Sequence, residues 1–308
     1  MSVDAAAQGV IDALQGSPAF ASMTPEQVRG AVGSFVGLQK PHQDIAKVID
    51  EAYEGPGGNQ PLRIYIPRTD EVLPVVVYFH GGGFIGGDLA VAQEPMRALA
   101  NDAGVIVVAA SYRLAPEHPF PAATNDTYAA LHWAADNIGQ YGGDASKIVV
   151  MGDSAGGNLA AVAAQRAKND GGPHLSGQIL IYPIIDANAR LGSRAEFGEG
   201  YIVTAADLDS FWGSYLSTPQ DAENPLATPS KAESLAGLPP ALVVTTEYEV
   251  ARDEAEAYAA AMAEAGTETE TRRIEGLIHG AYWMSGAVPR SSEIHDAAVA
   301  FLRRQFTR

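Results

Sequence analysis

A serine stands between two glycines in the segment Gly152-Asp153-Ser154-Ala155-Gly156, which has the G-x-S-x-G spacing of a nucleophilic serine. An apolar run typical of a strand precedes it at 147–151, and a run typical of a helix follows at 158–166. So tight a turn leaves almost no room for a Cβ two residues before or after the serine, and glycine stands at both places. The pattern predicts that Ser154 lies on a strained strand-to-helix turn, where its hydroxyl can attack a carbonyl carbon.

A serine nucleophile needs a base, and three histidines follow Ser154 in the chain: His174, His279 and His295. In an elbow site of this kind the acid and the histidine come after the serine in chain order. His174 falls in a loop just after the elbow helix, and His295 falls within the last predicted helix. His279 lies in a loop directly after the last predicted strand, at the sheet edge where catalytic groups converge. We therefore predict that His279 is the base.

The base needs an orienting carboxylate, which is expected after the predicted strand at 241–246. The candidates are Glu247, Glu249, Asp253 and Glu254. Asp253 and Glu254 would occupy the first turn of the next helix, where an acidic residue is favoured by the helix dipole alone. Glu249 lies in the loop between strand and helix, so it is the preferred acid, and Asp253 remains the alternative.

The segment His80-Gly81-Gly82-Gly83-Phe84 directly follows an apolar run at 75–79. Consecutive glycines leave backbone N–H groups free to converge on a negatively charged oxygen, and the N–H of Ala155, after the serine, would complete such an oxyanion hole. His80 is predicted to hold this loop by hydrogen bonds and not to act as the base.

The elements that must position these groups alternate between strand and helix. Strands are predicted at 63–66, 75–79, 105–110, 147–151, 178–182, 241–246 and 269–274, and helices at 91–103, 121–138, 158–166, 253–265 and 291–306. This order predicts an α/β fold with a mostly parallel sheet covered by helices on both faces.

Two segments depart from the alternation. Residues 1 to about 50 are predicted to be helical, with Thr24 capping a helix and Gln27 closing its capping box, and the glycine-rich loop at 55–59 is interpreted as a boundary. The segment 188–235 carries apolar residues on one helical face: Leu208, Phe211, Trp212, Tyr215 and Leu216. That face is either an ordinary buried one or a lid over an apolar pocket.

The division predicted for the chain is therefore an N-terminal helical cap segment (1–54), a first core part (55–187), a cap insertion (188–235) and a second core part (236–308). For the apolar substrate pocket we select four aromatic residues: Phe84, Phe211, Trp212 and Tyr215.

Composition narrows the function further. The 308-residue chain has a net charge of −17, which disfavours nucleic acids and anionic membranes as partners. It has no cysteine, which excludes disulfides, thiol catalysis and cysteine-ligated metals, and no other metal-ligand spacing, dinucleotide fingerprint or P-loop. We expect no metal and no cofactor. No apolar run is long enough to span a membrane and the N-terminus does not have the pattern of a signal peptide, so a cytoplasmic protein is expected.

Together these motifs resemble the hormone-sensitive-lipase-like family of α/β-hydrolases, in its bacterial esterase branch. The resemblance extends from about Leu62 to the C-terminus and is carried by four stretches: His80–Phe84, Tyr112–Ala123 (YRLAPEHPFPAA), Gly152–Gly157 and His279-Gly280. One stretch departs from the family. The usual Asp-Pro-Leu-Arg-Asp-Glu is Glu249-Val250-Ala251-Arg252-Asp253-Glu254 here, so a glutamate replaces the acid and the proline is missing.

The resemblance implies an α/β-hydrolase fold with a helical cap and a carboxylesterase acting on short to medium acyl esters without a cofactor. It implies Ser154 as nucleophile, His279 as base and an oxyanion hole made by Gly82, Gly83 and Ala155, and it suggests a homodimer through the last strand and helix. Two alternatives remain: an amidase or deacetylase with the same residues, and a non-catalytic receptor for a small ligand. A plant hormone receptor of this family lacks the catalytic histidine, whereas His279 is present here.

Overall fold

The computed structural model describes residues 2–307, and its centre is one twisted sheet with strand order β1-β2-β4-β3-β5-β6-β7-β8. The strands are β1 (Lys47–Gly55), β2 (Gly58–Ile66), β3 (Leu73–Phe79), β4 (Ile106–Ala110), β5 (Gly143–Asp153), β6 (Gly177–Ile181), β7 (Ala241–Tyr248) and β8 (Thr269–Ile278). β1 and β2 pair antiparallel, β2 pairs antiparallel with β4, and all other pairs are parallel. The predicted α/β class, with a mostly parallel sheet between helices, is confirmed.

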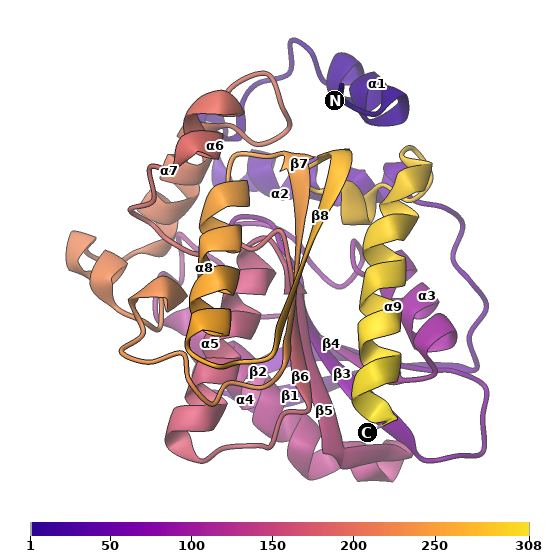
Figure 1. Cartoon of the computed structure of the whole chain (residues 1–308). Helices are drawn as coiled ribbons and strands as arrows, with labels where there is room; N and C mark the ends of the chain where they lie inside the picture. Colours follow the sequence, from indigo (N-terminus) through magenta and orange to yellow (C-terminus); the bar gives the residue numbers. More distant parts are fainter. Residues whose placement is uncertain (1, 308) are drawn as a thin grey trace.

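Helices cover both faces of the sheet. α3 (Gln93–Ala103) and α9 (Ser292–Phe306) pack together on one face, and α4 (Ala122–Asn137), α5 (Ala155–Asp170) and α8 (Arg252–Glu264) cover the other (Figure 1). β3, β4, β6 and the part of β5 at 148–151 are nearly continuous in apolar residues because parallel strands between two helix layers meet no water. The core therefore lies on both sides of these four strands.

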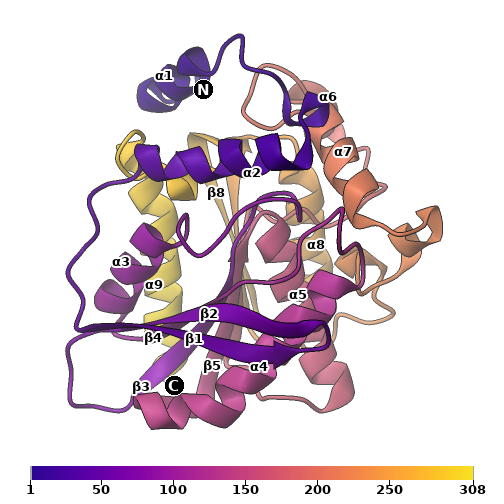
Figure 2. The same cartoon turned by 180° about the vertical axis from the view of Figure 1, so that it is seen from behind.

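A further set of helices lies over the carboxyl ends of the parallel strands, as both views show (Figures 1 and 2). We call it the overlying layer: α1 (Ala5–Ala13), the short 3₁₀ turns η1 (Phe20–Ser22) and η2 (Ser34–Leu38), α2 (Pro25–Gly33), α6 (Gly192–Glu196) and α7 (Ala205–Tyr215). Its N-terminal and later segments are joined by Asp207, whose Oδ1 accepts a 2.7 Å hydrogen bond from the Ala21 N–H. The layer covers the sheet edge where β3, β5, β7 and β8 end.

Most predicted elements are confirmed with boundaries shifted by a few residues. The capping box predicted at α2 is present, with the Thr24 hydroxyl bound to the Gln27 N–H and the Gln27 side chain bound to the Thr24 N–H. Such reciprocal bonds satisfy two backbone donors that the first helical turn leaves without partners.

Residues 1 to about 50 were predicted to be helical and 55–59 to be a boundary loop; both predictions are wrong over residues 47–59. β1 forms a hairpin with β2 in which Gly55 pairs with Gly58, so the glycine-rich segment is a tight turn within the sheet and not a loop between segments. β1 was missed because it is an exposed edge strand with charged residues such as Lys47, Asp50 and Glu51 on its surface, and it lacks the apolar run that marks a buried strand.

Within the described residues, no helix is long and apolar enough to cross a membrane.

Candidate active site

Ser154 occupies the turn between β5 and α5 with φ 54° and ψ −120°, a backbone conformation that non-glycine residues rarely adopt. The glycines on either side are required by close backbone packing. A Cβ on Gly152 would lie 2.1 Å from the Gly156 oxygen, and a Cβ on Gly156 would lie 2.0 Å from the Phe79 oxygen. The prediction that these positions have no room for a side chain is confirmed, and the turn holds Ser154 at the end of the sheet.

Three predicted residues meet in a line of hydrogen bonds. His279 Nε2 lies 2.9 Å from Ser154 Oγ, and His279 Nδ1 lies 3.2 Å from Glu249 Oε2. The Thr246 hydroxyl also donates to Glu249 Oε2, at 2.9 Å. All three catalytic candidates are buried, with Glu249 only 1% exposed. In this geometry the imidazole can take the serine proton while the carboxylate favours the cationic ring.

The other carboxylates considered as the acid have different partners. Glu247 Oε2 accepts the Gly276 N–H at 2.8 Å, Asp253 Oδ2 accepts the Ser193 N–H at 2.8 Å, and Glu254 Oε1 accepts the Ile185 N–H at 2.7 Å. Of the four candidates, Glu249 is the one in contact with His279.

Gly82 and Gly83, in the glycine loop after β3, line the same cavity as Ser154 and His279. Gly82 and Gly83 have φ values of 115° and 63°, so both lie in the region that favours glycine. A Cβ on Gly83 would lie 2.6 Å from the ring of Phe211. The N–H groups of Gly82, Gly83 and Ala155 have no hydrogen-bond acceptor within residues 2–307, which leaves them available to an oxyanion.

The chain has relatives in a known family. Residues 76–283 match a family model described as alpha/beta hydrolase fold. The chain belongs to the α/β-hydrolase fold family. The hormone-sensitive-lipase-like resemblance read from the motifs is confirmed by the relatives that follow.

The hydrolase is 41% identical to the esterase LipI of Mycobacterium tuberculosis over 270 residues, covering 86% of this chain and 84% of LipI. It is similar to the crystal structure of a hyperthermophilic esterase from Pyrobaculum calidifontis, with a TM-score of 0.95, 38% identity and complete coverage of both chains. It is also 32% identical to the gibberellin receptor GID1B of Arabidopsis thaliana over 235 residues, 74% of this chain and 64% of the receptor.

One residue of the hydrolase's site was missed by the sequence reasoning. Asp153, beside the nucleophile, is buried, and its Oδ1 accepts hydrogen bonds from the Tyr78 hydroxyl at 2.5 Å and from the Gly81 N–H at 3.1 Å. Burial raises the pKa of Asp153 to about 7. The signal that could have revealed it is a charged residue between a buried strand and the serine. Asp153 ties the glycine loop to the serine turn.

His80 likewise holds the glycine loop, as predicted: its Nδ1 lies 2.8 Å from the Gly81 oxygen, and its ring stacks on Tyr112 at 4.5 Å. Burial lowers the pKa of His80, which keeps the imidazole neutral.

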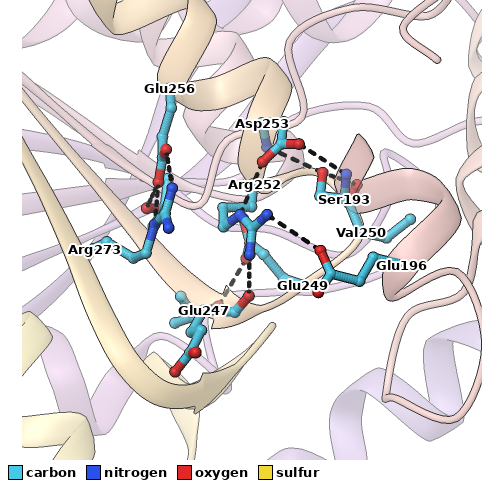
Figure 3. A network of polar contacts seen from close by, with 11 residues as sticks. Ser193, Glu196, Glu247, Glu249, Val250, Arg252, Asp253, Glu256 and Arg273 are labelled. Atoms are coloured by element: carbon cyan, nitrogen blue, oxygen red, sulfur yellow. Dashed lines mark hydrogen bonds and ion pairs between the residues drawn. The ribbon is translucent and has the colours of Figure 1, made fainter. Parts of the chain in front are cut away.

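A polar network connects the loop that carries Glu249 to the overlying layer (Figure 3). The Arg252 guanidinium donates to the Glu247 carbonyl at 3.0 Å and to Asp253 Oδ1 at 2.9 Å, and it lies 3.7 Å from the Glu196 carboxylate. Ser193 Oγ donates to the Val250 carbonyl at 3.0 Å. Helix α6 is therefore bound to residues that follow Glu249, and Arg252 connects it to the carbonyl of Glu247, which precedes Glu249.

The hydrolase has two neighbouring cavities here, an inner one at Ser154 and a larger outer one within the overlying layer. The inner one has a volume of about 40 Å³ and is lined by Ser154, His279, the glycine loop and Phe211. Of the four aromatic residues selected for the substrate pocket, the structure brings Phe211 to this cavity. Phe84, Trp212 and Tyr215 are not among the residues that line it: Tyr215 stacks on Phe84 at 3.8 Å, with Trp212 beside them.

No group of three or more His, Asp or Glu side chains that could hold a metal ion occurs within residues 2–307.

Proposed function

We propose that this protein is a serine carboxylesterase that works through an acyl-enzyme on Ser154. The observation that carries the proposal is the continuous path from Ser154 Oγ to His279 Nε2 at 2.9 Å and from His279 Nδ1 to Glu249 Oε2 at 3.2 Å. The identity of 41% to an esterase from Mycobacterium tuberculosis supports the same reaction.

In the first half of the reaction, His279 takes the Ser154 proton while Oγ attacks the ester carbonyl carbon. The negative charge on the carbonyl oxygen is received by the N–H groups of Gly82, Gly83 and Ala155, each of which can contribute about 3 kcal/mol in the transition state. His279 then passes its proton to the leaving alcohol. Glu249 keeps the ring oriented with Nε2 toward the serine and stabilises the imidazolium.

In the second half, His279 takes a proton from water, the resulting hydroxide attacks the acyl carbon, and Ser154 leaves as its alcohol after recovering a proton from His279. The acid is released. We further propose that the overlying layer is a cap that closes the site from water, and that it limits the acyl group to short or medium length.

The test is a Ser154→Ala variant assayed with p-nitrophenyl acetate, together with labelling by a fluorophosphonate. We expect the variant to lose at least 10³-fold in kcat, on the order of what removing a nucleophile costs, and the label to appear on Ser154 in the unmodified protein alone. Near-full activity of the variant, or labelling elsewhere, would remove the proposal.

A second candidate is favoured by one observation, the 32% identity to a gibberellin receptor. Binding of a small ligand without turnover would fit a receptor. The His279 side chain in hydrogen-bond contact with Ser154 argues for catalysis, because a receptor has no need to keep a base against this hydroxyl.

Matched ester and amide substrates distinguish the esterase from an amidase or deacetylase.

A homodimer is also proposed. β8 is an edge strand of the sheet and β8 and α9 lie next to each other, so a second copy could extend the sheet there. Sedimentation or size-exclusion chromatography with light scattering measures this directly.

A further inference from the structure

The inner cavity at the serine borders a much larger apolar chamber in the overlying layer. The outer chamber has a volume of about 460 Å³, against about 40 Å³ for the inner one. Its walls come from α1, η1, α2 and the segment before α7, and include Ile11, Met23, Ala31 and Tyr201. The two cavities share three lining residues, Phe20, Phe35 and Ile202, which form the boundary between them.

We propose that the substrate is divided between these two spaces: a small acyl group stays in the inner cavity, and a long or bulky apolar alcohol part of the ester extends past Phe35 into the outer chamber. This inference rests on the proposed esterase function and names its substrate class, which is acetate-like esters of large apolar alcohols.

The position of the leaving oxygen supports placing the alcohol part toward the outer chamber. His279 Nε2 must come within hydrogen-bond reach of that oxygen in order to protonate it, so the alcohol part lies on the histidine side of the carbonyl carbon. Phe35 lies on that side: its ring is 3.5 Å from where a Cβ on Gly280 would stand, and 6.1 Å from the ring of Trp283. The alcohol part is thus led toward the residue that borders the outer chamber.

The inner cavity is closed by Phe211 at the glycine loop, which supports a small acyl group. The ring of Phe211 lies so close to Gly83 that a Cβ there would be 2.6 Å from it. The Phe211 ring packs against Phe20 at 5.7 Å, and its helix α7 is held to the core by Tyr215, which stacks on the buried ring of Phe84. A long acyl chain would have to displace this packed aromatic wall, which costs free energy, whereas an acetyl group does not.

The chemistry of the outer chamber supports an apolar alcohol part. Asp207 is the one carboxylate among its lining residues, which include no Lys, Arg or His, and both of its oxygens are occupied, by the Ala21 N–H at 2.7 Å and the Thr204 N–H at 2.8 Å. No charge is left free to bind a polar group. Since apolar surface is transferred from water into such a space favourably, the chamber suits a hydrocarbon chain or ring without charge.

The experiment compares two isomeric esters, hexyl acetate and ethyl hexanoate, which have the same atoms and nearly the same overall hydrophobicity. We expect kcat/KM for hexyl acetate to exceed that for ethyl hexanoate by about tenfold, because only the acetate fits its acyl group into the inner cavity. Equal values, or a preference for ethyl hexanoate, would overturn the proposal.

Filling the outer chamber tests the location. Ala31 borders the outer chamber and not the inner one, so Ala31→Trp should lower the ratio of kcat/KM for hexyl acetate to that for ethyl acetate at least fivefold, and Ala31→Leu should lower it less. Val36 is 40% exposed and lines neither cavity, so Val36→Trp is the control and should leave the ratio unchanged. An unchanged ratio in both Ala31 variants, with unaltered melting temperatures, would contradict the assignment.

Failure of the esterase proposal and failure of the proposed substrate division give different results. If no ester is hydrolysed, including ethyl acetate, the esterase proposal itself is wrong. If ethyl acetate is hydrolysed and the isomers are not distinguished, the esterase stands and the division of the substrate is wrong.

Discussion

Asp253 and Ser193 exchange two hydrogen bonds: the Ser193 N–H donates to Asp253 Oδ2 at 2.8 Å, and the Asp253 N–H donates to Ser193 Oγ at 3.1 Å. The pair joins the first turn of α8 to the first turn of α6, 60 residues apart in sequence. Each side chain therefore satisfies a backbone donor at the start of the other residue's helix, a structural task that is unrelated to His279. This relationship gives Asp253 a structural reason to be an acid and supports the proposal that Glu249 is the catalytic one.

The first prediction concerns the choice of acid. Glu249→Gln should lower kcat for an acetate ester by about 10³-fold or more, because an amide cannot stabilise the imidazolium and holds the wrong tautomer of the ring. Asp253→Asn should lower kcat less than tenfold, since an amide oxygen can still accept the Ser193 N–H. Steady-state kinetics at pH 7.5 gives the ranking. A larger loss in Asp253→Asn would move the acid role to Asp253.

A second prediction concerns Arg252, which is nearly buried and binds the Glu247 carbonyl, Asp253 and Glu196 (Figure 3). Arg252→Met keeps most of the side-chain volume and removes these bonds, so we expect a loss of about 1–3 kcal/mol in the free energy of unfolding, as for other buried polar networks. A several-fold drop in kcat should accompany it, because the adjacent loop positions Glu249.

Arg272→Met is the matched control for Arg252. Arg272 has a side chain that is 61% exposed and, among residues 2–307, forms an ion pair with Glu270 alone, at 3.4 Å, so its loss should cost less than about 0.5 kcal/mol. Urea denaturation of both variants measures the difference. Equal effects at the two positions would show that the network near Glu249 is not special.

The third prediction addresses Asp153. Asp153→Ala removes the acceptor for Tyr78 and Gly81 and should lower kcat about 10²-fold by loosening the oxyanion loop, with little change in KM. Asp153→Asn keeps an oxygen acceptor and should retain most of the activity. If Ala and Asn lower kcat equally, the charge and not the hydrogen bonding is what matters.

The fourth prediction is a pH dependence of stability at Glu254, which lies away from the serine. Burial raises the pKa of Glu254 from its ordinary value to about 8, so between about pH 4.5 and 8 the folded protein holds a proton that the unfolded chain releases. Stability then falls as pH rises through this window, by up to about 1.4 kcal/mol per pH unit.

Glu254→Gln has no side chain that can ionise at this position. Between pH 5 and pH 8 its free energy of unfolding should therefore fall less than that of the unmodified protein. The Gln carbonyl can still accept the Ile185 N–H. Chemical denaturation at the two pH values measures the difference, and parallel pH curves for the two proteins would refute the shifted pKa.

Much of the site could be predicted because its chemistry depends on local patterns. The glycines around Ser154 are required by backbone clashes that any such turn produces, and the glycine run at 81–83 follows from the need for bare amides. Chain order then selects His279, and loop position selects Glu249. The buried strands were found because parallel strands between helix layers must be apolar throughout.

Other features could not be predicted because they depend on contacts between segments far apart in sequence. The aromatic residues of α7 form one apolar stripe in the sequence, yet only Phe211 reaches the inner cavity while Trp212 and Tyr215 pack against Phe84. Which part of a stripe faces a cavity is set by how the helix docks, and one residue of rotation changes it.

The sequence by itself indicated the α/β fold class and the chain order of the proposed catalytic groups, since these follow from residue type, spacing and periodicity, and the motif resemblance to a known family added the ester-hydrolase class. Only the tertiary structure decided that Asp153 anchors the oxyanion loop, that Asp253 binds Ser193, and that Phe20, Phe35 and Ile202 divide the space above Ser154. The physical reason is that partners at long sequence separation are chosen by packing of the whole core, which no local pattern encodes.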